Sequence, residues 1–234
     1  MENMKKIHRF ITPYNVTHNQ IKITDKELIH QWKNVLKFKN GEDVVLVNKE
    51  VGEAICTLQE INQEYAIFDI QKINKRLDEN QKEITLYMAI LKNENFELVI
   101  QKASEIGIQK IVPIITTRTI KTGIKLERLT KIAKEASELS GGINIPLICE
   151  PILFNDALKD VKKYEQKIIF HPSEQKYKST NKTNIAIFVG PEGGFTDQEI
   201  IDAEKNGCEV MSLGKSILRG ETAGIVASYI TMNI

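Results

Sequence analysis

Hydrophobic and polar positions divide the chain into a first part of short apolar runs and a longer part where apolar runs alternate with helical patterns. Residues 43–72 hold three runs rich in Val, Ile, Tyr and Phe, interrupted near 48–52 and 62–64, which predicts three closely spaced strands. A helix is expected before them, from about 25 to 36. Small β-barrels are built from such strands, so the first part is interpreted as a barrel domain.

The longer part has the pattern of an α/β domain. Apolar runs and helical periodicity predict strand 84–91, helix 96–107, strand 110–115, helix 125–142, strands 167–171 and 185–190, helix 196–207, strand 208–214 and helix 221–230. Strands that alternate with helices favour a parallel sheet covered on both faces. Pro113 suggests an edge or a bulge, and Thr196 with Glu199 forms a capping-box pair.

A charged segment separates the two patterns. Residues 73–83 lack aromatic side chains and are interpreted as a linker. With 234 residues, the chain has room for one large domain or two small ones. The sequence therefore predicts a barrel domain over 1–72 and an α/β domain over 73–234.

Composition narrows the class of protein without identifying a partner. The chain is 41% hydrophobic and 27% charged with a formal net charge of +1, which is ordinary for a globular protein. The charge is uneven, because residues 1–39 carry eight Lys/Arg against three acidic residues, whereas residues 40–72 carry two against seven. A basic face and an ordinary solvated surface both fit this asymmetry.

Cysteine spacing and hydropathy argue against a disulfide-rich, a metal-binding and a membrane-spanning protein. Cys56, Cys149 and Cys208 are far apart, and no CxxC or His-x-x-x-His spacing occurs, so we expect neither a disulfide framework nor a metal site. No apolar run approaches membrane-spanning length, and no signal core follows the charged N-terminus. We expect a cytoplasmic protein with no membrane segment.

The loop GPEGG at 190–194 is the first candidate for a ligand site. It joins a buried strand to a helix, where open α/β sheets bind ligands, and its glycines permit close approach of backbone to ligand. It matches neither GxxxxGK[ST] nor GxGxxG, and Glu192 would repel a phosphate, so a cationic or hydroxyl-bearing ligand fits better. A tight strand–helix turn that needs Gly and Pro explains the loop equally well.

A second glycine-bearing loop, SLGKSILRGETAG at 212–224, also follows a predicted strand. Two such loops at neighbouring strand ends would line one crevice. A helix cap or ion pair would explain Glu221 as well, but it explains Arg219 less readily because the dipole at a helix N-terminus disfavours a cation.

FVGPEGGFTDQEI followed by LGKSILRGETA closely resembles the signature of the SPOUT methyltransferases that modify N3 of a uridine in 16S ribosomal RNA. The likeness extends from HRF at 8–10 through LKNENFELVIQKASEIGIQKIVPIITTRT at 91–119 to EASELS at 135–140. It implies an RNA-binding PUA-like β-barrel over 1–72 and an α/β trefoil-knot domain over 73–234. It also implies a homodimer that uses S-adenosyl-L-methionine. Knots are so rare that pattern alone would argue against one.

The resemblance implies that backbone groups of the two loops wrap the cofactor, which would explain the glycines. The implied cofactor residues are Phe170, His171, Val189, Gly190, Pro191, Glu192, Gly193, Gly194, Ser212, Leu213, Gly214, Ile217, Leu218, Thr222 and Ala223.

Catalysis on uridine requires that the N3 proton leaves and that the reactants are aligned. Arg219 is the candidate for stabilising the uracil oxygens or orienting a phosphate, and Glu192 for accepting a hydrogen bond or the proton; the sequence leaves these roles open. Because N3 lies on the pairing edge, the base is expected to be unstacked into the site.

The expected partner is 16S ribosomal RNA within the small ribosomal subunit. The candidate phosphate contacts are Arg9, Lys37, Lys39, Lys92, Lys102 and Arg118. Three positions depart from the family pattern: Leu139 and Gly142 stand where Gln and Arg are common, and Lys37 stands where the family has Arg. The losses of arginine remove bidentate donors.

Two other functions fit the sequence. One is a SPOUT enzyme that acts on a ribose 2′-OH or on transfer RNA. The other is a non-catalytic RNA-binding protein of ribosome assembly that keeps the fold, although the presence of the cofactor-loop residues argues against it.

Overall fold

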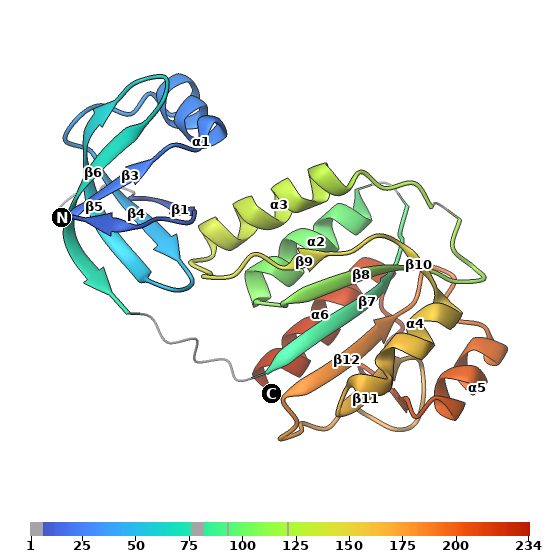
Figure 1. Cartoon of the computed structure of the whole chain (residues 1–234). Coiled ribbons are helices and arrows are strands. Elements are labelled where there is room, and N and C mark those ends of the chain that lie inside the picture. The colour runs from blue at the N-terminus through green and yellow to red at the C-terminus, as the bar shows by residue number, and fades with distance from the viewer. Residues whose placement is uncertain (1–6, 76–81, 93, 121) are drawn as a thin grey trace. The chain divides into compact units, whose positions relative to one another are not determined.

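The computed structural model describes residues 7–75, 82–92, 94–120 and 122–234. The chain splits into two compact units, Met1–Asp78 and Glu79–Ile234 (Figure 1). The segment expected to be a linker, 73–83, contributes its first two residues to the last strand of the first unit and its final residue to the first strand of the second. Residues 76–81 of that segment lie outside the described part of the chain.

The first unit is a six-stranded sheet with the order β1-β4-β5-β6-β3-β2. β1 and β4 are parallel, and every other neighbouring pair is antiparallel. The three strands predicted over 43–72 are confirmed as β4, β5 and β6, whereas β1, β2 and β3 were not predicted. The strands are β1 (His8–Ile11), β2 (Val16–Thr17), β3 (Gln20–Ile23), β4 (Asp43–Asn48), β5 (Gly52–Ile61) and β6 (Ala66–Asn74).

The predicted helix of the first unit is present as α1 (Lys26–His30), which continues as a π-helix, η1 (Gln31–Val35). Asp25 caps its start by accepting hydrogen bonds from the backbone N–H groups of the first turn. The helix carries Trp32 into the core, where the indole packs edge-on against Phe10 and Phe68 at ring-centroid distances of 5.2 and 5.3 Å. This aromatic cluster anchors the helix to the sheet.

The second unit has the predicted parallel sheet, with the order β10-β8-β7-β12-β11-β13 and β9 paired to β8. All its pairs are parallel. The strands are β7 (Glu83–Ala89), β8 (Lys110–Ile115), β9 (Leu147–Ile148), β10 (Ile152–Leu153), β11 (Gln166–Phe170), β12 (Asn184–Val189) and β13 (Glu209–Met211).

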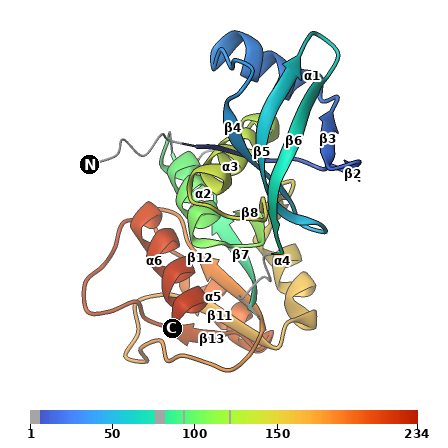
Figure 2. The same cartoon turned by 90° about the vertical axis from the view of Figure 1, so that its left-hand side faces the viewer.

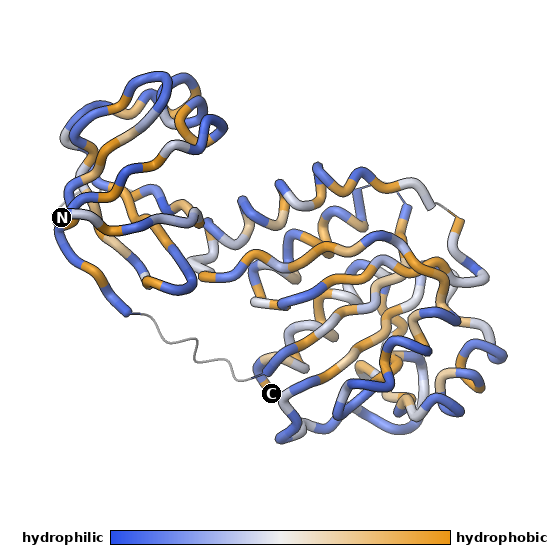
Figure 3. Tube along the Cα trace, viewed as in Figure 1, coloured by the Kyte–Doolittle hydropathy of each residue, from blue (hydrophilic) through white to orange (hydrophobic). Residues whose placement is uncertain are grey.

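Helices cover both faces of this sheet, which explains its continuous apolar strands (Figures 1 and 2). Leu86 and Met88 of β7 belong to the core beneath α2, α3 and α6, whereas the alternating Tyr87 and Ala89 belong to the core beneath α4 and α5. Figure 3 shows the hydrophobic colour concentrated along the strands between these layers. The helices are α2 (Asn95–Ile106), α3 (Leu126–Leu139), α4 (Phe154–Asp160), the 3₁₀ turn η2 (Val161–Lys163), α5 (Asp197–Lys205) and α6 (Gly220–Asn233).

Pro113 does not mark an edge or a bulge, contrary to the prediction. β8 pairs with β7 in uninterrupted register and with β9 and β10 on its other side. The Ile111 carbonyl accepts from Cys149, whereas the Ile114 carbonyl accepts from Ile90 of the β7 side. Backbone groups of β8 alternate between its two sides, so the nitrogen of Pro113 faces the interruption between β9 and β10. Proline has no N–H to donate, and at this position no ladder hydrogen bond is lost.

The helix signals of the sequence are confirmed at both ends of α5 and at the end of α2. Thr196 and Glu199 form the reciprocal capping box. Gly107 and Gly207 follow α2 and α5 with positive φ angles of 97° and 80°. The predicted strand 208–214 is shorter, because at Ser212 the chain leaves the ladder and its hydroxyl bonds the backbone of Gly214.

Candidate functional site

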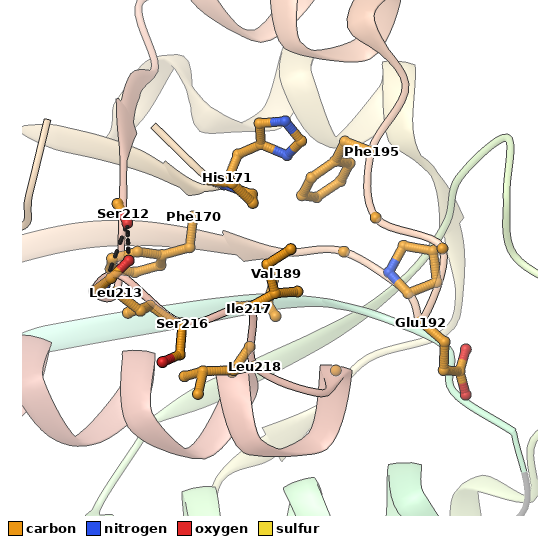
Figure 4. A pocket seen from close by; sticks show the side chains of 18 of the residues that line it. Phe170, His171, Val189, Glu192, Phe195, Ser212, Leu213, Ser216, Ile217 and Leu218 are labelled. Atoms are coloured by element: carbon orange, nitrogen blue, oxygen red, sulfur yellow. Dashed lines mark hydrogen bonds between the residues drawn. The ribbon is translucent and has the colours of Figure 1, made fainter. Parts of the chain in front are cut away.

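A cavity of about 260 Å³ lies where the two glycine-bearing loops meet (Figure 4). The neighbouring strands β12, β11 and β13 end at Val189, Phe170 and Met211, and the residues that follow them form its walls. Because all three strands run parallel, their carboxyl ends meet at the same edge of the sheet. The sheet therefore brings together three segments that are far apart in sequence.

Every residue expected to bind the cofactor lines this cavity except Thr222, which is exposed on the first turn of α6. The cavity also contains residues that were not predicted for it. They are Arg118, which was assigned to RNA, and Pro172, Phe195, Lys215, Ser216 and Gly220. Phe195 directly follows the GPEGG loop, so its position in the sequence could have indicated that it lines the cavity.

Apolar side chains give the cavity its walls. Figure 4 shows Phe170, Val189 and Leu218 around the same space, with Leu213 at one end. Polar side chains also line the cavity. One of them, Ser212, is occupied by the backbone of Gly214, to which it donates at 2.8 Å and from which it accepts at 3.2 Å. A hollow with apolar walls and some polar groups suits a flat heterocycle with polar edges.

Glycines stand where the loops approach one another. A Cβ on Gly190 would lie 3.1 Å from the Phe195 ring, and one on Gly220 would lie 2.8 Å from a methyl group of Leu91. Gly214 differs, because its φ of +144° disfavours any side chain while a Cβ there would meet no atom within 4 Å. Gly190 and Gly220 permit packing between segments, whereas Gly214 leaves open space beside the cavity.

The Glu192 carboxylate points away from Phe170 and Leu213 (Figure 4). Its Oε1 accepts a hydrogen bond of 2.8 Å from the backbone N–H of Lys92, in the segment after β7. The Glu192 side chain therefore fastens the glycine loop to a neighbouring strand end. One carboxylate oxygen is left without a protein donor among the described residues.

Arg219 is the N-cap residue of α6 and does not line the cavity. Its side chain is exposed and makes no hydrogen bond or ion pair with any residue that the structure describes. Arg219 lies between Leu218 and Gly220, which both line the cavity, so its guanidinium is available to a molecule bound there.

The environment of His171 in the cavity displaces the pKa of its imidazole. Burial lowers the pKa of His171 below its ordinary value, the positive charge of Arg118 lowers it further, and the carboxylate of Asp197 opposes the shift. The imidazole is therefore neutral at pH 7 and brings no positive charge to the cavity.

The cations expected to bind RNA differ in their surroundings. In the first unit, Arg9 pairs with Glu53 at 2.5 Å with both side chains 15% exposed, whereas Lys37 and Lys39 are exposed. In the second unit, Lys92 is exposed and Lys102 pairs with Glu105 at 2.8 Å.

Arg118 also has protein partners. Its Nη1 donates to the carbonyls of Gly193 at 2.7 Å and Phe195 at 3.2 Å.

Within the ranges that the structure describes, no group of three His, Cys, Asp or Glu side chains could hold a metal ion. The same residues include no helix that is long and apolar enough to cross a membrane.

Comparison with protein families gives two matches. The RNA methyltransferase domain family matches residues 78–232, and the RNA methyltransferase PUA domain family matches residues 33–71. The ribosomal RNA small subunit methyltransferase E of Rickettsia conorii is 31% identical over 96% of this chain and 94% of its own length. The protein of that name from Mesomycoplasma hyopneumoniae is 39% identical over 67% of this chain and 71% of its own length.

Solved structures share the whole fold. The ribosomal RNA small subunit methyltransferase E of Neisseria gonorrhoeae, bound to S-adenosyl methionine, has a TM-score of 0.85 at 27% identity and covers 96% of both chains. A methyltransferase of Legionella pneumophila in complex with the same cofactor has a TM-score of 0.84 at 28% identity over 97% of both chains.

Proposed function

The chain belongs to the RNA methyltransferase family and has its SPOUT fold, a trefoil-knotted α/β domain with a PUA-like barrel domain, and from this premise we propose that it methylates 16S ribosomal RNA of the small ribosomal subunit. The methyl donor is S-adenosyl-L-methionine, the cofactor present in two of its structural relatives. The observation that carries the proposal is one cavity formed by the loops after three adjacent parallel strands.

The cavity fits this cofactor on its own geometry. Gly214 combines a backbone conformation that disfavours side chains with open space where a Cβ would stand, as expected where a ligand lies against the chain. Phe170, Val189 and Leu218 supply apolar surface for an adenosine. When bound, S-adenosyl-L-methionine supplies an electrophilic methyl group, and the protein has to hold and orient the acceptor.

We propose that the acceptor is N3 of a uridine, which must lose its proton. Arg219 would stabilise negative charge on the uracil oxygens, because its exposed guanidinium has no protein partner among the described residues. Glu192 would accept a hydrogen bond through the carboxylate oxygen that Lys92 does not use. The neutral imidazole of His171 lines the cavity without repelling the cationic cofactor.

The RNA backbone would be held by lysines that are exposed and pair with no carboxylate among the described residues. Lys37 and Lys39 of the barrel domain and Lys92 of the α/β domain meet this description, and we assign them phosphate contacts. Arg9 and Lys102 are weaker candidates because each is paired with a glutamate. We further propose that the protein works as a homodimer, as the family resemblance implies, and that it is located in the cytoplasm.

Calorimetric titration with S-adenosyl-L-methionine tests the cofactor assignment. We expect saturable binding that persists in the presence of a chelator, because the lining contains no cluster of metal ligands within the described ranges. Absence of binding, or binding of ATP in its place, would contradict the proposal.

A further inference from the structure

We propose that Arg118 is a positioning residue that holds the glycine loop, residues 190–195, in the conformation that binds the cofactor. The inference rests on the proposed function, because it concerns the same cavity. It assigns to Arg118 a role different from the phosphate contact that the sequence favoured.

The Arg118 backbone is fixed by the turn that follows β8. The N–H of Thr119 donates to the Thr116 carbonyl at 3.1 Å, and the N–H of Thr116 donates to the Thr119 hydroxyl at 2.9 Å. The two threonine hydroxyls lie 2.9 Å apart and share a further hydrogen bond. This reciprocal arrangement closes residues 116–119 into a rigid turn with Arg118 inside it.

A buried carboxylate attaches this turn to the segment after the glycine loop. Glu199 is only 7% exposed. Its Oε1 accepts from the N–H of Thr117 at 2.8 Å, and its Oε2 accepts from the N–H and the hydroxyl of Thr196 at 2.8 and 3.0 Å. Glu199 therefore serves the helix cap and the turn at once, and it fixes the distance between the ends of β8 and the loop.

The Arg118 side chain then contacts the loop directly. Nη1 donates to two loop carbonyls, those of Gly193 and Phe195, at 2.7 and 3.2 Å. A Cβ built on Gly193 would lie 3.3 Å from Cδ of Arg118, so the arginine stem packs flat along the loop at this glycine. The loop itself turns through a hydrogen bond of 2.8 Å from the Gly194 N–H to the Pro191 carbonyl, with Gly194 at a φ of +68°.

The other side of the loop is held by different contacts. The Glu192 carboxylate accepts from Lys92, and the Glu192 N–H lies 3.7 Å from the Cβ position of Gly220 at the start of α6. Arg118 on one side and these contacts on the other fix a loop with three glycines, which would otherwise sample many conformations. Fixing the loop before the ligand arrives lowers the entropic cost of binding.

A lysine cannot reproduce this arrangement. The planar guanidinium places a donor against two carbonyls while its stem lies along Gly193, whereas an ammonium is a compact, strongly hydrated point charge. Phosphate contact, in contrast, is largely an effect of charge, which lysine retains. The substitution Arg118→Lys therefore separates the two roles.

The test compares Arg118→Lys and Arg118→Ala with the wild type and with Arg128→Lys. Arg128 is an exposed arginine on α3, ion-paired with Glu97 at 2.7 Å and outside the cavity lining, so it is the matched control. The measurements are the Kd of S-adenosyl-L-methionine, the Kd of 16S ribosomal RNA, the thermal midpoint, and KM and kcat for methyl transfer. We expect Arg118→Lys to raise the cofactor Kd and KM on the order of tenfold, since hydrogen bonds from a charged group are lost.

With Arg118→Lys, kcat at saturating cofactor, RNA affinity and the thermal midpoint should stay near the wild-type values, and Arg128→Lys should change none of them. Arg118→Ala should lose cofactor affinity at least as strongly, and if it fails to fold, Arg118→Lys decides. Unchanged cofactor affinity in Arg118→Lys, or a loss confined to RNA affinity in Arg118→Ala, would overturn the inference. If the wild type itself does not bind S-adenosyl-L-methionine, the proposed function fails instead.

Discussion

At the scale of the residue, the glycines of the two loops have different structural roles, which could not be distinguished from the sequence alone. Gly190 and Gly220 let packed segments approach, whereas Gly214 adopts a φ of +144° with empty space beside it. The sequence indicated that side chains must be absent, but it left a tight turn and a ligand site open. The cavity at these loops favours the ligand site.

Gly214→Val should weaken cofactor binding more than RNA binding. A branched side chain at this φ is strained by about 1–3 kcal/mol, and it would occupy the open space beside the cavity. Calorimetry with S-adenosyl-L-methionine measures the loss. Gly41→Val is the matched control, because Gly41 also has a positive φ and open space but lies in the barrel domain; unchanged cofactor affinity in a folded Gly214→Val would mean that the loop is only a turn.

Arg219→Ala should fold and bind cofactor nearly normally yet transfer methyl groups slowly. Loss of a preorganised donor at the reacting group typically costs about 3 kcal/mol, roughly a hundredfold in rate. Arg219→Lys should restore only part of the rate, because a point charge cannot replace a planar fork. Single-turnover methylation with saturating RNA, beside a thermal melt, is the measurement.

Two results would remove this assignment. A wild-type rate for Arg219→Ala would show that the guanidinium has no chemical role. An early melt or a change in oligomeric state would show that Arg219 belongs to the scaffold.

Acidification should destabilise the protein through His171. Its folded-state pKa is lowered, mainly by burial, so the unfolded chain binds the proton more tightly. The stabilising contribution is complete above the unfolded pKa, about 6.5, and is lost as pH falls through the folded value. Urea unfolding at pH 7, 6 and 5 should therefore show a smaller loss of unfolding free energy in His171→Gln than in the wild type; parallel losses would contradict the assignment.

At the scale of the element, hydrophobic pattern and capping signals predicted most of the α/β domain. The helices α2, α3, α5 and α6 and the central strands begin and end near the expected residues, because apolar periodicity and glycine stops are local properties. The short strands β9 and β10 and helix α4 were missed, since two-residue strands carry no periodicity. Pro113 was misinterpreted because the break between β9 and β10 depends on tertiary pairing.

Thr196→Ala tests the N-terminal cap of α5, the helix that follows the glycine loop. The substitution removes the cap of α5 and one donor to the buried Glu199 carboxylate, and a lost N-cap typically costs about 1 kcal/mol of unfolding free energy. A thermal midpoint lower by roughly 2–4 °C is expected for a protein of this size. Thr130→Ala, at an exposed position within α3, should leave the midpoint unchanged or slightly higher; equal effects of the two substitutions would contradict the capping role.

At the scale of the whole molecule, the two-part organisation was visible in the sequence but the knot was not. A change from closely spaced strands to alternating strands and helices marks two patterns, and the structure has two units. Chain threading leaves no local signal, so the knot entered only through resemblance to a family. The convergence of Phe170, Gly190 and Gly214 likewise depends on the order β12-β11-β13, which the pattern of apolar runs does not encode.

Methyl transfer to ribosomal RNA is the activity in which the cavity, the barrel domain and Arg219 are proposed to act together. The most direct test incubates the purified protein and labelled S-adenosyl-L-methionine with small ribosomal subunits that lack the modification, then identifies the labelled nucleoside after digestion of the 16S ribosomal RNA. We expect the label in N3-methyluridine at a single position, and its loss with Arg219→Ala. Absence of transfer, or label only in 2′-O-methylated nucleosides, would contradict the proposed reaction.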